Sequence, residues 1–319
     1  MNPSKIIQAF EKNETFLVTT HINPDPDALC SQLVTASYLK SKGKRVYLIN
    51  HDAVPERFHF LPSTKSIKKI TKGKKINYDV LVVLDCGDLD RIGEVKNLIK
   101  PNKIIINIDH HVTNHMFGNL NLVVPNASST SEVMYGLLRR AQVPLDKNMA
   151  TLIYLGIMTD TGSFRYDNTS AHTHEIVSHL LKFNIHVSEL YRKIYENVPL
   201  TDLKYFTRIA DNFEALYKGK VVCVELLKSV YNKFSEDFDL RDKIFKHLRT
   251  IRGVEVLVIL TEENKNRTRI NLRSQRKVNV ARLASLFGGG GHRKASGCVI
   301  EEGIIEARKK IVKAIGNVL

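Results

Sequence analysis

Cysteine, tryptophan and long apolar runs are scarce or absent in this chain of 319 residues. Its four cysteines lie far apart in the sequence, and no C-x-x-C pair occurs. This pattern excludes a disulfide framework and a structural zinc site built from cysteines. No segment approaches the roughly 20 consecutive apolar residues of a membrane helix, and the N-terminal segment lacks the pattern of a signal peptide. We therefore expect a cytoplasmic protein with reduced thiols.

Lys and Arg residues outnumber Asp and Glu residues, and the formal net charge is +15. An excess of Lys and Arg favours polyanionic partners, because it raises the local concentration of ligands that carry phosphate. The basic run at residues 65–75 is equally well explained as a solvated face. No G-x-x-x-x-G-K-[ST] loop is present, so an NTPase has no support. The charge therefore favours a nucleotide or nucleic-acid substrate without identifying it.

A chain of this length usually folds around more than one hydrophobic core, so we expect two domains. Residues 1–186 alternate apolar strands with helices, which predicts an α/β domain with a parallel sheet. A helical connector is expected at residues 187–218, and a smaller α/β domain at 219–319. Helices are predicted within these regions at residues 28–41, 93–99, 147–158, 171–183, 187–196 and 201–216, among others.

Several predicted strands stop abruptly on residues that bind metals. The run at residues 103–108 is followed by Asp109, His110 and His111, the strand at 15–20 by His21, and the strand at 78–84 by Asp85. In open α/β sheets ligands bind outside the carboxyl ends of the strands, so we expect these side chains to converge.

Three more acids stand at predicted helix ends. Prolines flank Asp25 and keep it extended, and Asp27 follows near the start of a helix, where carboxylates are favoured. Asp160 lies at the C-terminus of the helix predicted at residues 147–158, where the helix dipole disfavours a carboxylate unless a cation offsets it. That placement is costly for a structural Asp and natural for a metal ligand.

Taken one at a time, these residues have ordinary explanations. A single Asp at a strand end is usually a turn residue or a helix cap, and a single His is more often hydrogen-bonded than metal-bound. Taken together, they form an oxygen-rich set that suits manganese or magnesium better than structural zinc. Several carboxylates with one candidate bridge indicate two metals, an arrangement used in phosphate-ester hydrolysis. The set comprises His21, Asp25, Asp27, Asp85, Asp109, His110, His111 and Asp160.

Near the C-terminus, four glycines precede His292, between a predicted helix and a strand. They are either a flexible hinge or a run of backbone amides able to wrap a phosphate. Arg273 and Ser274 end the preceding strand, and the guanidinium could bind a base or a phosphate.

Six ordered motifs, which span nearly the whole chain, resemble the DHH phosphoesterase superfamily with its C-terminal DHH-associated domain. They are HINPDPDA, VLDCGD, NIDHH, GIMTDTGSFRY, LRS and GGGGHRKASG. The similarity is greatest to the bacterial group of oligoribonucleases (nanoRNases) that also dephosphorylate 3′-phosphoadenosine 5′-phosphate. The sequence departs from the common pattern at Gly288, a fourth glycine where many relatives have three.

The resemblance implies two manganese ions, with Mg²⁺ or Co²⁺ as substitutes, in a cleft between the domains. One ion would be held by His21, Asp25 and Asp85, and the other by Asp27, Asp85, His110 and Asp160, with Asp85 as the bridge. His111 would face the scissile phosphate, and Asp109 would orient an imidazole. The resemblance also implies that the second domain binds the distal nucleotide through Arg273, Ser274, Gly289, Gly290, Gly291 and His292.

The function implied by the resemblance is a manganese-dependent phosphodiesterase that releases 5′-mononucleotides from short oligoribonucleotides by two-metal activation of water. A candidate second substrate is 3′-phosphoadenosine 5′-phosphate, and a homodimer would fit the family. One alternative is hydrolysis of cyclic di-AMP or of linear dinucleotides. A second alternative is a nucleotide-binding sensor without activity, which predicts lost ligands, whereas all the expected ligands are present.

Overall fold

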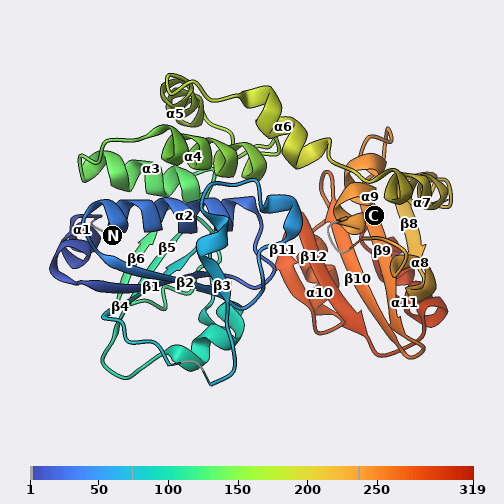
Figure 1. Cartoon of the computed structure of the whole chain (residues 1–319). Helices are drawn as coiled ribbons and strands as arrows, with labels where there is room; N and C mark the ends of the chain where they lie inside the picture. The colour runs from blue at the N-terminus through green and yellow to red at the C-terminus, as the bar shows by residue number, and fades with distance from the viewer. Residues whose placement is uncertain (1–2, 74, 236–237) are drawn as a thin grey trace. The chain divides into compact units, whose positions relative to one another are not determined.

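A computed structural model describes residues 3–73, 75–235 and 238–319, and these form two compact units, residues 1–197 and 198–319. Each unit is built on one six-stranded sheet (Figure 1). No helix within the described residues is long and apolar enough to cross a membrane.

The first unit contains a parallel sheet with the strand order β3-β2-β1-β4-β5-β6. The order fits βαβ construction, because the chain passes through helices or loops between neighbouring parallel strands. Its strands are β1 (Thr15–Thr20), β2 (Arg45–Asn50), β3 (Ile67–Lys69), β4 (Val80–Leu84), β5 (Ile104–Asp109) and β6 (Leu120–Val123).

Apolar side chains cover both faces of this sheet, and alternate residues of one strand enter different cores. Val80, Val82 and Leu84 pack in the core that holds α2 to α4, whereas Leu81 and Val83 pack against the segment around η3. Figure 1 shows α2, α3 and α4 together over one face. The helical elements are α1 (Pro3–Lys12), α2 (Pro26–Ser41), η1 (Glu56–Phe58), η2 (Thr64–Ser66), η3 (Leu89–Leu98), α3 (Thr130–Arg140), α4 (Lys147–Asp160), α5 (Ala171–Leu181) and α6 (Val187–Tyr195).

The second unit contains a mixed sheet with the order β11-β12-β10-β9-β8-β7, in which only β8 and β9 pair in parallel. One face packs against α10 and α11, and the other against α9. Its elements are α7 (Leu200–Ala210), β7 (Glu214–Leu216), β8 (Val221–Leu226), α8 (Lys228–Tyr231), α9 (Leu240–Leu248), β9 (Val256–Asn264), β10 (Arg267–Ser274), α10 (Val280–Ser285), β11 (Gly290–His292), β12 (Ala295–Ile300) and α11 (Ile304–Gly316). The predicted α/β fold, with a parallel N-terminal sheet and a smaller second domain, is confirmed.

Two predicted helices differ from the structure. The helix expected at residues 201–216 ends at Ala210, and residues 214–216 instead form β7, which pairs with β8. The helix expected at 93–99 is a pair of 3-10 segments interrupted at Gly93, whose φ of +57° leaves helical geometry. In both cases a helical pattern of apolar residues was overridden, once by sheet pairing and once by a glycine in the left-handed region.

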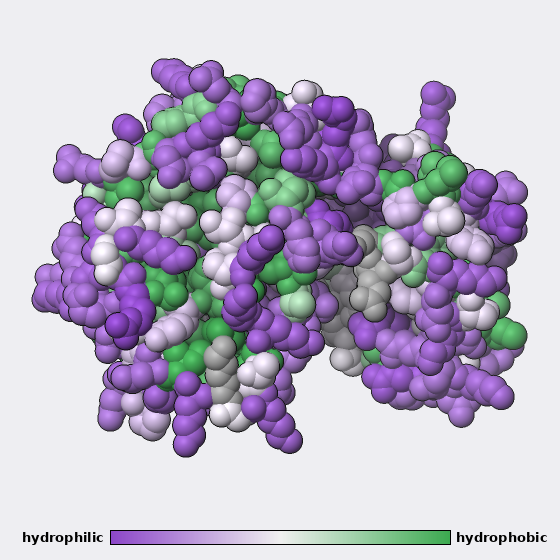
Figure 2. All heavy atoms as spheres, viewed as in Figure 1, coloured by the Kyte–Doolittle hydropathy of each residue, from purple (hydrophilic) through white to green (hydrophobic). Residues whose placement is uncertain are grey.

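Hydrophilic side chains dominate the outside of each unit on the face shown in Figure 2. The apolar residues named above are buried, so the sequence pattern and the burial agree.

Candidate metal centre

The centre is built at the carboxyl ends of three neighbouring strands. β1, β4 and β5 are adjacent in the sheet and point the same way, because their pairings are parallel. His21 follows β1, Asp85 follows β4, and Asp109 ends β5, with His110 next. The predicted convergence of these strand ends therefore has a direct cause in the sheet order.

Asp85 lies in the middle of this group. Its carboxylate is buried, with Oδ2 3.6 Å from His21 Nε2 and Oδ1 3.7 Å from His110 Nε2. The backbone of Asp85 has a φ of +55°, a left-handed conformation that costs a residue with a side chain about 1 kcal/mol or more. The fold holds Asp85 in this strained conformation, where its two oxygens face different imidazoles.

Both imidazoles are oriented by main-chain carbonyls. His21 Nδ1 lies 2.8 Å from Ile22 O, and His110 Nδ1 lies 3.2 Å from Ala127 O. A carbonyl can only accept a hydrogen bond, so each Nδ1 carries the proton in the neutral ring. Each Nε2 then directs its lone pair toward the carboxylates, which is the tautomer that binds metals.

Asp27 is held by the start of α3. Its two oxygens accept hydrogen bonds from the backbone amides of Thr130, at 2.7 Å, and Ser131, at 3.0 Å. The Thr130 hydroxyl also donates to Asp85 Oδ1 at 2.8 Å, and Thr130 is fully buried. Thr130 therefore touches two of the predicted ligands. The sequence shows this segment only as a helix start with capping-box spacing from Ser129 to Glu132, so the contact was not foreseen.

Asp25 and Asp160 stand at helix ends, as predicted from the sequence. Asp25 Oδ1 caps α2 by accepting from the Ala28 amide at 3.0 Å, which leaves its other oxygen free of that bond. Asp160 is the last residue of α4, and its Oδ2 lies 3.3 Å from His110 Nε2. Neither acid is held by a salt bridge to Lys or Arg within the described residues.

Three overlapping donor sets arise from this packing. Within each set one donor atom from each residue lies within 4.8 Å of the others. The sets are His21 with Asp25 and Asp85, Asp27 with His110 and Asp160, and Asp85 with His110 and His111. Ligands about 2.0–2.2 Å from one ion are separated by roughly 3–4 Å, so these spacings fit shared divalent cations. The residues present therefore fit a metal centre.

The pKa shifts of the residues in the centre also indicate a site for cations. Burial, reinforced by the charge of Asp85, raises the pKa of Asp27 to about 7. Burial and neighbouring carboxylates also raise the pKa of Asp160 well above its usual value. Burial opposes charge on His21 and His110, but the nearby carboxylates outweigh it and raise both pKa values. Negative charge is thus excessive here, and a dication would relieve it.

His111 is placed differently from His110. Its Nδ1 lies 2.7 Å from Asp109 Oδ1, and Asp109 Oδ2 accepts from Asn114 Nδ2 at 2.6 Å. Asp109 is fully buried, whereas His111 is half-buried. The structure thus places a fixed, partly exposed imidazole 3.8 Å from Asp85 Oδ1.

Comparison with known proteins agrees with this centre. Residues 15–157 match the model of the DHH family, N-terminal domain, and residues 220–319 match the DHHA1 domain. The protein is a DHH-family phosphoesterase. The predicted family membership is confirmed, and every candidate ligand except Asp160 lies within the residues that match the DHH domain.

Two relatives align in sequence with this DHH phosphoesterase over nearly its whole length. A Thermus thermophilus protein named bifunctional oligoribonuclease and PAP phosphatase is 28% identical over 93% of this chain and 88% of its own length. A Bacillus subtilis protein with the same name is 28% identical over 93% of both chains. The structure of an exopolyphosphatase-related protein from Bacteroides fragilis superposes with a TM-score of 0.91 at 28% identity, covering 99% of this chain and 95% of that one.

In the DHHA1 domain, Arg273 and Ser274 lie on opposite faces of β10. Arg273 is exposed, and its guanidinium carbon lies 4.8 Å from the centre of the Phe245 ring. Ser274 is buried beside α10, and its hydroxyl has no hydrogen-bond partner within the described residues. Of these two predicted substrate-binding residues, only Arg273 reaches solvent.

Some of the glycines at residues 288–291 of the DHHA1 domain have structural roles. A Cβ on Gly289 would meet Gly297 O at 2.2 Å, so this position requires glycine. The amides of Gly288 and Gly289 donate to Ser285 O and Ala284 O, which interrupts the expected run of free amides. Gly290 and Gly291 lie in the edge strand β11, and the side chain of His292 lies outside the described residues.

Proposed function

We propose that this DHH phosphoesterase is manganese-dependent, releases 5′-mononucleotides from short oligoribonucleotides, and dephosphorylates 3′-phosphoadenosine 5′-phosphate. The observation that carries the proposal is the group of three donor sets, which overlap at Asp85 and at His110. The names of the Thermus and Bacillus relatives support the choice of substrates. The oxygen-rich ligands support manganese or magnesium over thiolate-seeking metals.

We assign one cation to His21, Asp25 and Asp85, and a second to Asp27, Asp85, His110 and Asp160. Two divalent cations at such a centre neutralise phosphate charge and make water a stronger acid. Asp85 would contribute to both sites, since its Oδ2 lies near His21 and its Oδ1 near His110. Thr130 and the start of α3 fix the orientation of Asp85 and Asp27, so little rearrangement is needed when substrate binds.

His111 is the group that we place against the scissile phosphate. Asp109 fixes the ring through Nδ1 and supports positive charge on it, since this contact and Asp85 outweigh burial and raise the pKa of His111. When protonated, this imidazole can stabilise developing negative charge or donate a proton to the leaving oxygen. In the DHHA1 domain, the exposed Arg273 is the side chain that we assign to the distal nucleotide.

Product analysis tests the proposal. Purified protein with Mn²⁺, Mg²⁺ or Co²⁺ should degrade end-labelled di- to pentanucleotides to 5′-mononucleotides and convert 3′-phosphoadenosine 5′-phosphate to AMP. Cyclic di-AMP and its linear product in the same assay test the alternative substrates. If all of these substrates stay intact with every metal, the protein is not this enzyme and a nucleotide sensor becomes the better description. Cytoplasmic location and a homodimer stay predictions.

A further inference from the structure

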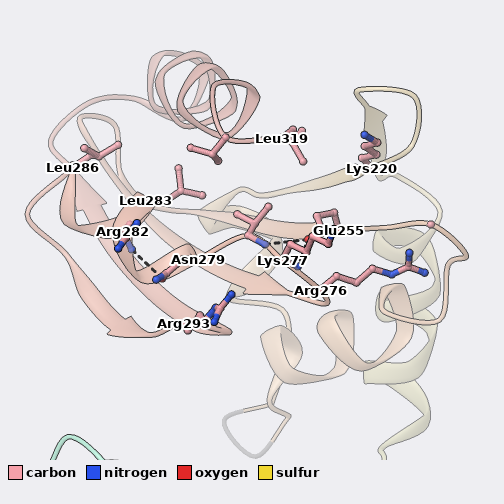
Figure 3. A pocket seen from close by; sticks show the side chains of 13 residues that line it. Lys220, Glu255, Arg276, Lys277, Asn279, Arg282, Leu283, Leu286, Arg293 and Leu319 are labelled. Atoms are coloured by element: carbon pink, nitrogen blue, oxygen red, sulfur yellow. Dashed lines mark hydrogen bonds between the residues drawn. The ribbon is translucent and has the colours of Figure 1, made fainter.

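A basic hollow of about 980 Å³ lies in the DHHA1 domain, around the loop that joins β10 to α10. Five cationic side chains and one acid line it, together with an apolar part. The charged residues are Lys220, Glu255, Arg276, Lys277, Arg282 and Arg293. Figure 3 shows Arg282 and Arg293 beside Asn279, with Arg276 and Lys277 near Glu255.

The five cationic side chains of this hollow outnumber its one acidic side chain, Glu255. None of the five cations forms an ion pair within the part of the chain that the structure describes, and all five are exposed. Elsewhere in the same domain, by contrast, Arg267 and Arg269 pair with Glu263, and Arg308 pairs with Glu225. Like charges gathered without partners repel one another, and a bound anion removes that penalty.

The one acidic side chain in the hollow, Glu255, accepts hydrogen bonds from backbone amides. Glu255 Oε1 accepts from the amides of Lys277 and Val278, the latter at 3.0 Å. The Gln275 amide donates to Glu255 O at 2.9 Å, and the Val280 amide donates to Arg293 O at 3.0 Å. These bonds fix the loop that carries Arg276 and Lys277, so an anion need not order that loop when it binds.

The hollow is separate from the face that carries Arg273. Arg273 stacks on Phe245, which belongs to the core on the α9 side of the sheet. The hollow is lined by Val278 and Leu283, which belong to the core on the opposite, α10 side. A ligand here would therefore not occupy the nucleotide position proposed above.

We propose that the basic hollow is a second ligand site, which binds neighbouring phosphate groups of a nucleotide. Its volume lies at the upper end of the range of about 300–1,000 Å³ for small-molecule sites. Leu283 and Leu286 add an apolar part to the lining near Arg282, which suits the base and sugar of the same ligand. The phosphates could belong to a free nucleoside polyphosphate or to an RNA strand, since both present the same chemistry.

Binding to the intact chain in EDTA, where no hydrolysis is measured, tests this site separately from the proposed reaction. The probes are ATP and a 12-nucleotide RNA with a 5′-hydroxyl, titrated at low salt and followed by calorimetry. The paired change Arg276→Glu and Arg282→Glu should weaken binding of at least one probe about tenfold or more. Arg276→Gln with Arg282→Gln should weaken it less, because it removes charge without reversing it.

The matched control is Lys228→Glu with Lys265→Glu. It changes the net charge of the same domain equally, but these exposed lysines lie at the opposite end of β9 from Glu255. The control should alter affinity by less than about twofold under the same salt. Loss confined to ATP identifies a free nucleotide as the ligand, and loss confined to RNA identifies a strand. The proposal is overturned if neither probe binds saturably, or if the two pairs of changes weaken binding equally.

Discussion

The two units of this protein concentrate opposite charges, and they hold them in different ways. In the DHH domain, carboxylates gather near the carboxyl ends of the parallel strands, and each is held by backbone amides, a hydroxyl or an imidazole. Asp27 and Asp85 are buried, Asp160 is half-buried and Asp25 is exposed. In the DHHA1 domain, cations gather in the basic hollow and are exposed, and only the loop beneath them is held. Carboxylates that are oriented one by one suit small cations that demand fixed geometry, whereas exposed, adaptable cationic side chains suit larger anions of variable shape.

Asp85→Asn is the largest expected disruption of the carboxylate set. It leaves the shape of the side chain but removes a charge that belongs to two of the three donor sets, so we expect turnover to fall at least ~1,000-fold. Calorimetry with Mn²⁺ should show loss of binding at one site or both. The control is Asp90→Asn, an exposed acid outside the centre. If Asp85→Asn kept normal Mn²⁺ binding, Asp85 would not be a ligand.

Asp109→Asn tests whether Asp109 orients the His111 ring without itself binding a metal. The change removes the charge that holds His111 and leaves one acceptor oxygen where the carboxylate used two, toward His111 Nδ1 and Asn114 Nδ2. We expect kcat to fall about 10- to 100-fold, the usual effect of losing a carboxylate that orients a functional imidazole. Mn²⁺ affinity should change only a few-fold, since Asp109 is in none of the donor sets. An equal loss in kcat and Mn²⁺ affinity would contradict this division of roles.

Arg273→Ala tests the contribution of the DHHA1 domain to substrate binding. We expect KM to rise about tenfold with kcat nearly unchanged, because a contact to a distal phosphate is made equally before and during reaction. Arg269→Ala is the matched control, four residues earlier on the same face of β10 and already held by Glu263. Should both variants behave alike, Arg273 has no special role in binding.

The sequence was most informative where a feature is local along the chain. Apolar strands that stop on Asp or His predicted the ligand set around Asp85, because parallel strands bring their ends to one edge. The contact of Thr130 with Asp85 was missed, since it depends on where α3 docks against α2 rather than on a pattern. The basic hollow was missed for a similar reason: Lys220, Arg276 and Arg293 are far apart in sequence and meet only through the sheet.

Thr130→Val tests the contact that the sequence did not reveal. Valine keeps the shape and removes the hydroxyl that donates to Asp85, so we expect Mn²⁺ affinity to fall about fivefold, or ~1 kcal/mol. Thr130→Ser should restore most of this affinity. Calorimetric titration with Mn²⁺ and the thermal shift on adding Mn²⁺ are the readouts, and neither requires activity. If valine and serine were equally tolerated, the hydroxyl would have no positioning role.

The pH dependence of stability distinguishes a site built for cations from a merely buried acid cluster. The pKa of Asp27 is raised to about 7, and those of His21, His110 and His111 are also raised. Each of these groups favours the folded state when protonated, so metal-free protein should lose stability as the pH rises from 5.5 to 8. Mn²⁺ replaces those protons, and its stabilising effect should grow over the same range by up to about 1.4 kcal/mol per displaced proton and pH unit.

Thermal unfolding at pH 5.5 and 8, with and without saturating Mn²⁺, measures this difference. Asp27→Asn should flatten the slope of the metal-free protein, because the amide does not titrate. A Mn²⁺ shift that was the same at both pH values would show that no proton leaves when the metal binds. The raised pKa of Asp27 would then reflect burial alone, and Asp27 would be a structural acid held by the start of α3 rather than a ligand.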